Sequence, residues 1–265
     1  MICEKISLSE SSFVEVYAPE KPKQYKRDAL LIIPGGGYGE ICDDREGEPI
    51  ALEFMQKGYS CFVLHYSVGK KAKFPKPLIE ASAAIKHIKD NADKYNINSK
   101  RVFAMGFSAG GHLAASLGIL WNLEEIYAEI DMPYGYNKPI GILPIYPVVS
   151  ANVPTHISSF WNILGNTEPT KEELDKYSLE LYVNENSAPA FICHTSTDEA
   201  VSVHNSLCLA TAYAKAGLPF ELHVFKNAPH GIALGNKITM CGKSEWLVGG
   251  CWPELATKWM DSIDV

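Results

Sequence analysis

The 265-residue sequence lacks the marks of several common protein classes. It has no uninterrupted run of 18 apolar residues, and residues 1–10 combine neither a basic start nor an apolar core, so we expect neither a membrane span nor a secretory signal. Its formal net charge of −7 disfavours nonspecific binding to nucleic acid or to anionic membranes. These absences predict a soluble cytoplasmic protein without nucleic-acid or membrane partners.

Metal-binding and disulfide patterns are missing as well. The seven cysteines are odd in number and scattered, with no C-x-x-C pair, and the histidines show no H-x-x-x-H or H-E-x-x-H spacing. We therefore expect reduced cysteines, no metal and no cofactor. Four acidic residues are interpreted as helix-start charges, with calcium binding as the weaker alternative: Asp43, Asp44, Glu46 and Glu48.

Strand-like and helix-like patterns alternate along most of the chain. Apolar runs predict strands at residues 13–17, 29–33, 60–66, 101–105, 140–145, 189–194 and 220–225. Helical patterns occupy residues 47–57, 76–95, 112–117, 204–216 and 253–263. This order predicts one α/β domain over residues 1–265, with a mostly parallel central sheet and helices on both faces. Residues 147–186 break the alternation and are expected to form a small cap-like insertion.

Ser108 lies at the centre of the segment GFSAGG, between an apolar strand and a helix of small residues. A strand-to-helix turn of this kind strains the serine backbone, exposes the hydroxyl and requires small residues two positions either side. It also places the amide of Ala109 at a helix N-terminus, where it can donate to an oxyanion. Because serine is a favoured helix N-cap, a purely structural serine is the alternative.

Later strands supply candidates for a base and an orienting acid. Functional side chains of an open parallel sheet gather beyond the carboxyl ends of its strands. Asp198 and His230 each follow a predicted strand, and they complete the chain order Ser, Asp, His that is typical of an α/β-hydrolase. Glu199 is the alternative acid. Among the remaining histidines, His194 is interpreted as a support for the Asp198 loop and His112 as a packing residue.

Three successive glycines, Gly35 to Gly37, follow the early buried strand. Glycines here let the backbone approach a substrate carbonyl and turn its amides inward, as the HGGG-type element of esterases does. A phosphate cradle is disfavoured, since the lysine of GxxxxGK[ST] and the GxGxxG spacing are both missing. A flexible surface turn is the remaining alternative.

Five motifs together resemble the α/β-hydrolase superfamily: IPGGGY, DREGEPIALEF, GFSAGGHLAA, HTSTDEAV and APHGIAL. Within it the chain is similar to the bacterial acetyl-esterase and xylanase-B-like esterase group, related to hormone-sensitive-lipase-type esterases, over about residues 29–263. The resemblance implies Ser108 as nucleophile, Asp198 as acid and His230 as base. It also implies an oxyanion hole formed by the amides of Gly36 or Gly37 together with Ala109.

The sequence departs from the family pattern at two places. Pro34 stands where the histidine of HGGG would be, so any orienting hydrogen bond from that side chain is missing. Ala200 and Val201 stand in a stretch that the family often fills with D-x-x-V-P.

The resemblance implies a serine carboxylester hydrolase that removes acetyl groups, with acetylated xylo-oligosaccharides or similar sugars as the favoured substrate. Tyr38 and Trp161 are expected to supply aromatic walls for the sugar, with Trp246 and Trp252 as further candidates; tryptophans in the core are the alternative. An arylformamidase, a general short-chain carboxylesterase, a peptidase or a non-catalytic binding protein of the same fold would also fit these motifs. The sequence leaves both a monomer and a homo-oligomer open.

Overall fold

The computed structural model describes residues 1–20, 25–240 and 250–264, and in these ranges eight strands form one sheet. Their order is β1-β2-β4-β3-β5-β6-β7-β8, antiparallel from β1 to β4 and parallel from β4 to β8. The strands are β1 (Ile2–Ser7), β2 (Phe13–Ala18), β3 (Arg27–Ile33), β4 (Ser60–His65), β5 (Ile97–Phe107), β6 (Gly141–Ile145), β7 (Ala190–Thr195) and β8 (Phe220–Phe225). The predicted mostly parallel α/β sheet is confirmed.

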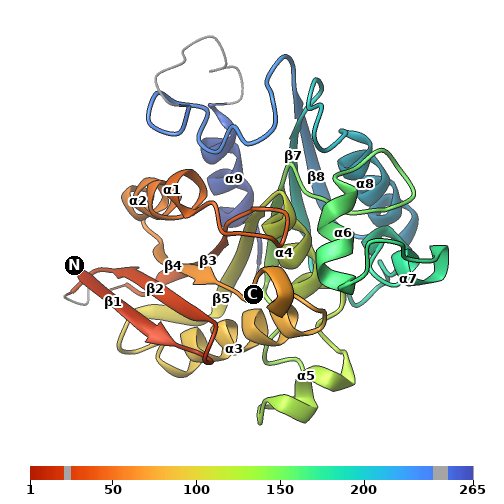
Figure 1. The fold of residues 1–265 in the computed structure, drawn as a ribbon. Coiled ribbons are helices and arrows are strands. Elements are labelled where there is room, and N and C mark those ends of the chain that lie inside the picture. The colour runs from red at the N-terminus through yellow and green to blue at the C-terminus, as the bar shows by residue number, and fades with distance from the viewer. Residues whose placement is uncertain (21–24, 241–249, 265) are drawn as a thin grey trace.

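Helices cover both faces of this sheet (Figure 1). The described helices are α1 (Asp43–Glu46), α2 (Glu48–Gln56), α3 (Lys76–Asp90), α4 (Ala109–Ile119), α5 (Glu124–Glu129), α6 (Ile157–Leu164), α7 (Lys171–Asp175), α8 (His204–Ala216) and α9 (Trp252–Asp261). The core has two layers, one on each face of the sheet, and the side chains of β3 alternate between them. Leu31 packs in the core under α3, α4 and α8, whereas Leu30 packs in the core under α2 and α9.

Some predicted boundaries need correction, and some elements, strand β1 and helix α5 among them, were not predicted. The helix expected to reach residue 95 ends at Asp90, because the Asn91 side chain bonds to the His87 carbonyl and competes with the next helical turn. Strand β1 is a partly exposed edge strand, and α5 has only six residues, so neither carries a strong periodic pattern.

The predicted insertion at residues 147–186 contains α6, α7 and the short 3₁₀ helix η2 (Leu179–Leu181). Helix α6 buries Ser159, Phe160 and Ile163, and it ends at Gly165 in the left-handed conformation that favours glycine. Its Asn162 side chain donates to the carbonyl of Gly37 at 2.9 Å. The insertion is therefore attached to the glycine loop that follows β3.

The described ranges contain neither a helix suited to crossing a bilayer nor a cluster of three metal-ligating side chains. Six cysteines in these ranges are free: Cys3, Cys42, Cys61, Cys193, Cys208 and Cys251. Cys241 and Trp246 lie outside the described residues.

Candidate active site

Ser108 occupies the sharp turn between β5 and α4. Its backbone has φ 53° and ψ −118°, a strained conformation for a residue other than glycine. A Cβ on Gly106 would overlap the Gly110 carbonyl, and one on Gly110 would overlap the Ile33 carbonyl, so both positions require glycine. The Ser108 side chain makes no capping bond to α4. The helix-capping alternative is therefore wrong, and the hydroxyl is free to reach another partner.

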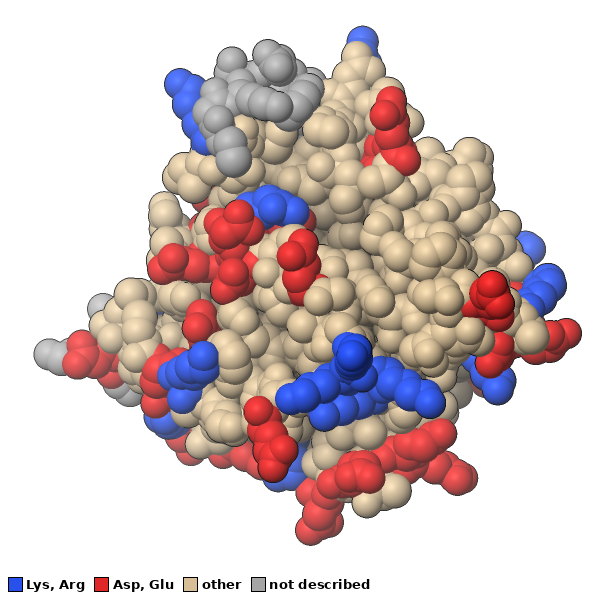
Figure 2. Space-filling view, in the orientation of Figure 1, with Lys and Arg blue, Asp and Glu red and all other residues tan. Residues whose placement is uncertain are grey.

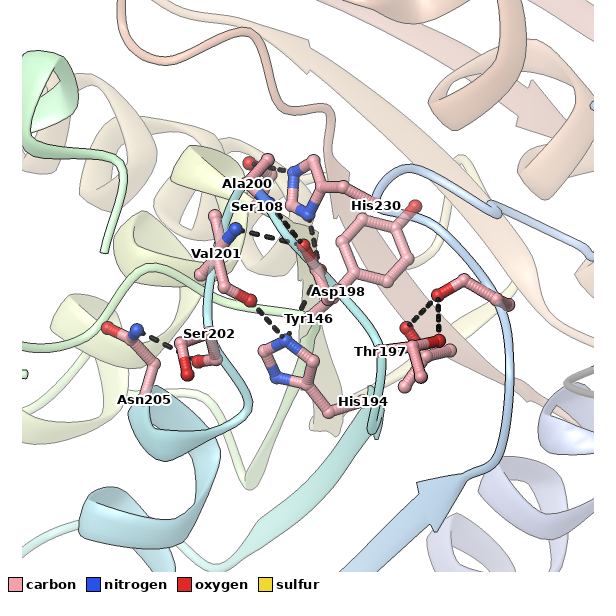
Figure 3. Close-up of polar contacts among 12 residues, drawn as sticks. Ser108, Tyr146, His194, Thr197, Asp198, Ala200, Val201, Ser202, Asn205 and His230 are labelled. Carbon is pink, nitrogen blue, oxygen red and sulfur yellow. Dashed lines mark hydrogen bonds and ion pairs between the residues drawn. The ribbon is translucent and has the colours of Figure 1, made fainter. Parts of the chain in front are cut away.

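Ser108, His230 and Asp198 form a continuous chain of hydrogen bonds (Figure 3). His230 Nε2 lies 2.8 Å from Ser108 Oγ, and His230 Nδ1 lies 2.6 Å from Asp198 Oδ2. Because a carboxylate only accepts, Nδ1 carries the ring proton and donates to Asp198. Nε2 is then the acceptor for the serine hydroxyl, the arrangement that a general base requires.

The carboxylate of Asp198 is buried and fully engaged. Its Oδ1 accepts from the amides of Ala200 at 3.0 Å and Val201 at 2.9 Å. Burial favours the neutral acid, but contacts from His194 and His230 outweigh it and hold the pKa of Asp198 well below its usual range. His194 Nε2 also lies 2.9 Å from the Val201 carbonyl, so it supports this loop as predicted.

The alternative acid, Glu199, is exposed, and the carboxylate that bonds to His230 belongs to Asp198. The two neighbouring acids differ in burial, since Asp198 is buried and Glu199 is exposed. Asp198 faces inward, where two backbone amides fix it.

The glycine loop lies directly beside the serine. A Cβ on Gly35 would lie 2.9 Å from Ser108 Cβ, so only glycine permits this approach. Gly36 and Gly37 have φ of 123° and 63° and line the same cavity as Ser108. In the described part of the chain, neither of their amides has a hydrogen-bond partner. The amide of Ala109, first in α4, has no acceptor within its own helix.

The expected substrate contact of Tyr38 is wrong. Its ring is fully buried, and its hydroxyl lies 2.8 Å from Nδ1 of His112, which is also buried. His112 Nε2 donates to the carbonyl of Tyr177 at 2.8 Å, which leaves Nδ1 to accept from Tyr38. This contact links the glycine loop, α4 and the insertion. Tyr38 is a core residue because its hydroxyl finds a buried acceptor and its ring packs among apolar side chains.

Stability at acid pH should depend on His112. Burial lowers the pKa of His112 from 6.5 to about 4, and an unfolded chain would regain the ordinary value. Between these two values the unfolded state binds more protons than the folded state. The contribution of His112 to the free energy of unfolding is therefore fully present above pH 6.5 and is lost as the pH falls to about 4. The shift corresponds to about 3 kcal/mol.

The variant His112→Gln keeps an acceptor for Tyr38 and a donor for Tyr177 but cannot titrate. Urea unfolding at about pH 7 and about pH 4.5 should show a smaller acid loss for the variant than for the wild type, by an amount approaching about 3 kcal/mol. Equal losses in both proteins would contradict a buried neutral imidazole.

A cavity of about 270 Å³ opens beside Ser108 and His230. Besides these two residues and the glycines of the loop, its lining consists of Glu40, Cys42, Arg45, Glu46, His156 and Ala200. In the described part of the chain this lining has no Phe, Tyr or Trp, so the expected wall from Trp161 is not found there; Trp161 lies half-buried on α6. Trp252 is fully buried in the core, so the alternative interpretation of a core tryptophan is correct for this residue.

Charged residues flank this region of the surface. Figure 2 shows a largely uncharged centre, with acidic side chains gathered over the part that Figure 1 labels α1 and α2. Arg45 lies among these acids, 3.6 Å from Asp44 and 3.9 Å from Glu46. The mouth of the cavity is polar and carries both signs of charge.

Sequence reasoning missed that His156 lines the cavity and that Glu46 is buried beside it. His156 precedes α6 in the insertion, where no motif marks it. Glu46 was interpreted as a helix-start charge, but it is buried and its Oε2 accepts from the Gly35 amide at 2.8 Å. The signal that could have found Glu46 is its place in the DREGEPIALEF motif.

Comparisons with known proteins identify relatives of this chain. A family model described as BD-FAE matches residues 14–213. The endo-1,4-beta-xylanase B of Butyrivibrio fibrisolvens is 39% identical over 80% of this chain and 33% of its own length. The acetylxylan esterase of Xylanibacter ruminicola is 28% identical over 83% of this chain and 43% of its own length. The chain thus spans less than half the length of these relatives.

Solved structures match nearly the whole chain. An acetyl ester-xyloside bifunctional hydrolase from Caldicellulosiruptor lactoaceticus has a TM-score of 0.81 at 31% identity, covering 98% of this chain and 96% of its own. A carboxylesterase from Lactobacillus plantarum has a TM-score of 0.84 at 26% identity, covering 98% and 97%. These findings confirm the resemblance stated from the motifs. The chain belongs to the BD-FAE family, within the esterases of the α/β-hydrolase superfamily.

Proposed function

We propose that the protein is a serine carboxylester hydrolase. The observation that carries the proposal is the hydrogen-bonded chain from Ser108 through His230 to Asp198 at the edge of an open cavity. In the reaction, Ser108 Oγ attacks the ester carbonyl while His230 Nε2 takes its proton. His230 then gives that proton to the leaving alcohol. Asp198 holds the ring in the required tautomer and stabilises its transient positive charge.

The acyl-enzyme is then hydrolysed with the same base. Water gives a proton to His230 and attacks the carbonyl carbon, and the proton returns to Ser108 as the acid leaves. The amides of Gly36, Gly37 and Ala109 are proposed to donate to the oxyanion in both steps. They lie beside Ser108, and within the described chain their hydrogens bond to no protein acceptor.

The proposed substrate is an acetyl ester of a sugar, with acetylated xylo-oligosaccharides as the favoured class. Two relatives support the choice: one is an acetylxylan esterase and the other an acetyl ester-xyloside bifunctional hydrolase. The lining adds a physical reason, because Arg45, Glu40 and His156 offer donors and acceptors to hydroxyl groups. A cavity near the lower end of the roughly 300–1,000 Å³ typical of small-molecule sites suits a short acyl group.

A panel of substrates tests this choice. We expect wild-type protein to hydrolyse 4-nitrophenyl acetate and acetylated xylo-oligosaccharides with kcat/KM at least about tenfold above 4-nitrophenyl octanoate and N-formylkynurenine. Release of acetate, followed by mass spectrometry of the sugar, measures the natural reaction. A preference for octanoate would indicate a lipase-like esterase, and a preference for N-formylkynurenine an arylformamidase. No turnover of any ester would support a binding protein.

A further inference from the structure

A buried carboxylate that takes no part in the triad lies against the cavity. Glu46 is 1% exposed, and each of its oxygens accepts one hydrogen bond. Oε2 accepts from the amide of Gly35 at 2.8 Å, and Oε1 accepts from the hydroxyl of Tyr146 at 2.9 Å. Arg45 Nε lies 3.9 Å away. A carboxylate is costly to bury, so these donors must be held firmly for the fold to tolerate it.

Tyr146 extends this contact to the loop of the catalytic histidine. Its hydroxyl donates to Glu46 and accepts from the amide of Ala233 at 3.0 Å. Its ring packs edge-on against the ring of His230, with centroids 5.1 Å apart, and the two residues lie side by side in Figure 3. A Cβ on Gly231 would lie 3.7 Å from Arg45 Nε and 4.0 Å from Glu46 Oε1, so this loop passes close to both side chains.

Each hydrogen bond around Glu46 and Tyr146 has a defined donor and acceptor. Burial raises the pKa of Glu46, whereas the Gly35 amide, Arg45 and the Tyr146 hydroxyl favour its ionised form. The ionised Glu46 only accepts, so the Tyr146 hydroxyl turns its hydrogen toward Glu46 and presents a lone pair to Ala233. On the other side, Glu46 takes the amide of Gly35. This bond fixes the first peptide of the glycine loop while the next two amides stay without a protein acceptor in the described residues.

We propose that Glu46 is a positioning residue that, through Gly35 and Tyr146, holds the oxyanion loop and the His230 loop in register across the cavity. The proposal rests on the proposed function, since it assigns Glu46 a role in the same reaction. Glu46 does not touch the reacting atoms. It acts by keeping the Gly36 and Gly37 amides aimed at the oxygen that becomes charged, and such aim matters most in the transition state.

Kinetics of Glu46→Ala, Glu46→Gln and Tyr146→Phe on 4-nitrophenyl acetate test the proposal. We expect kcat to fall about 100-fold in Glu46→Ala, comparable with the loss of one oxyanion donor, while KM changes less than about threefold. Glu46→Gln keeps the shape but places a donor against Gly35 or Tyr146, so its loss should be about tenfold. Tyr146→Phe should lower kcat by a similar factor. The double variant Glu46→Gln/Tyr146→Phe should lower kcat by less than the product of the two single factors.

Two controls separate positioning from general damage. Asp28→Asn removes a different, partly buried carboxylate, which accepts from Arg101 at 2.8 Å near the start of β3, at the opposite end of that strand from the glycine loop; it should lower the melting temperature but leave kcat within about twofold. Binding of 1,1,1-trifluoro-2-butanone, whose adduct with Ser108 carries an oxyanion, should weaken in step with kcat for the Glu46 variants.

The outcomes divide clearly. A folded Glu46→Ala protein with kcat within about threefold of wild type, or a loss confined to KM, overturns the proposal. If Glu46→Ala does not fold, the same criteria apply to Glu46→Gln and Tyr146→Phe, which disturb packing less. Wild-type protein that hydrolyses no ester defeats the proposed function itself, whereas active wild type with unaffected Glu46 variants defeats only the role of Glu46.

Discussion

Replacing Ser108 with alanine should lower kcat for aryl acetate hydrolysis by about 10⁵-fold, leaving a small activity that the oxyanion amides supply. The reason is that Ser108 Oγ is the atom that His230 Nε2 contacts at 2.8 Å, and no other hydroxyl replaces it in the cavity lining of the described chain. The measurement is steady-state release of 4-nitrophenol together with mass spectrometry for an acetylated Ser108.

Ser116→Ala is the matched control for this variant. Ser116 lies about two turns further along α4, is buried, and bonds to the carbonyl of His112. Its removal should leave kcat within about twofold. If Ser108→Ala retained wild-type turnover, the nucleophile would have to lie elsewhere, and the proposed function would lose its main support.

Asp198→Asn should lower kcat by about 10⁴-fold without unfolding the protein. Asparagine keeps the size of the side chain, but its amide group can present a donor to His230 Nδ1 and stabilise the wrong tautomer. The buried carboxylate also carries the charge that balances the imidazolium, since its pKa lies well below the usual range and it stays ionised at neutral pH. Stopped-flow measurement of the acylation rate reports the loss of catalysis, and circular dichroism reports whether the variant remains folded.

Glu199→Gln is the informative comparison, because it alters the neighbouring carboxylate. Glu199 is exposed, so this change should cost less than about threefold in kcat. A large loss in Glu199→Gln with little loss in Asp198→Asn would exchange the two acids and show that the loop after β7 has a different conformation in solution.

Much of the fold could be predicted because each local pattern agreed with the final sheet. The apolar runs that become β3, β5, β6 and β7 are largely buried on both faces, so they stand out as continuous hydrophobic segments. The elements that escaped prediction carry weak patterns. Strand β1 exposes every second residue at the sheet edge, and its position depends on pairing with β2.

The site was likewise predictable only in part. Ser108, Asp198 and His230 could be chosen because each follows a strand at the carboxyl edge, where topology alone gathers them. The prediction of aromatic walls failed, because residue type does not show whether a ring points toward a cavity or toward the core. Tyr38 lies next to the glycine loop in the sequence, yet its hydroxyl finds His112 and its ring is buried.

The sequence by itself determined the fold class, the strained serine turn and the order of the candidate triad, since these depend on local pattern and on strand order. Only the tertiary structure decided which polar groups meet inside. Glu46 is the clearest case: as one of four acids near a helix start it looked like a surface charge. Contacts with Gly35, 11 residues away, and Tyr146, 100 residues away, made it a buried carboxylate, because burial of charge depends on donors that only folding brings together.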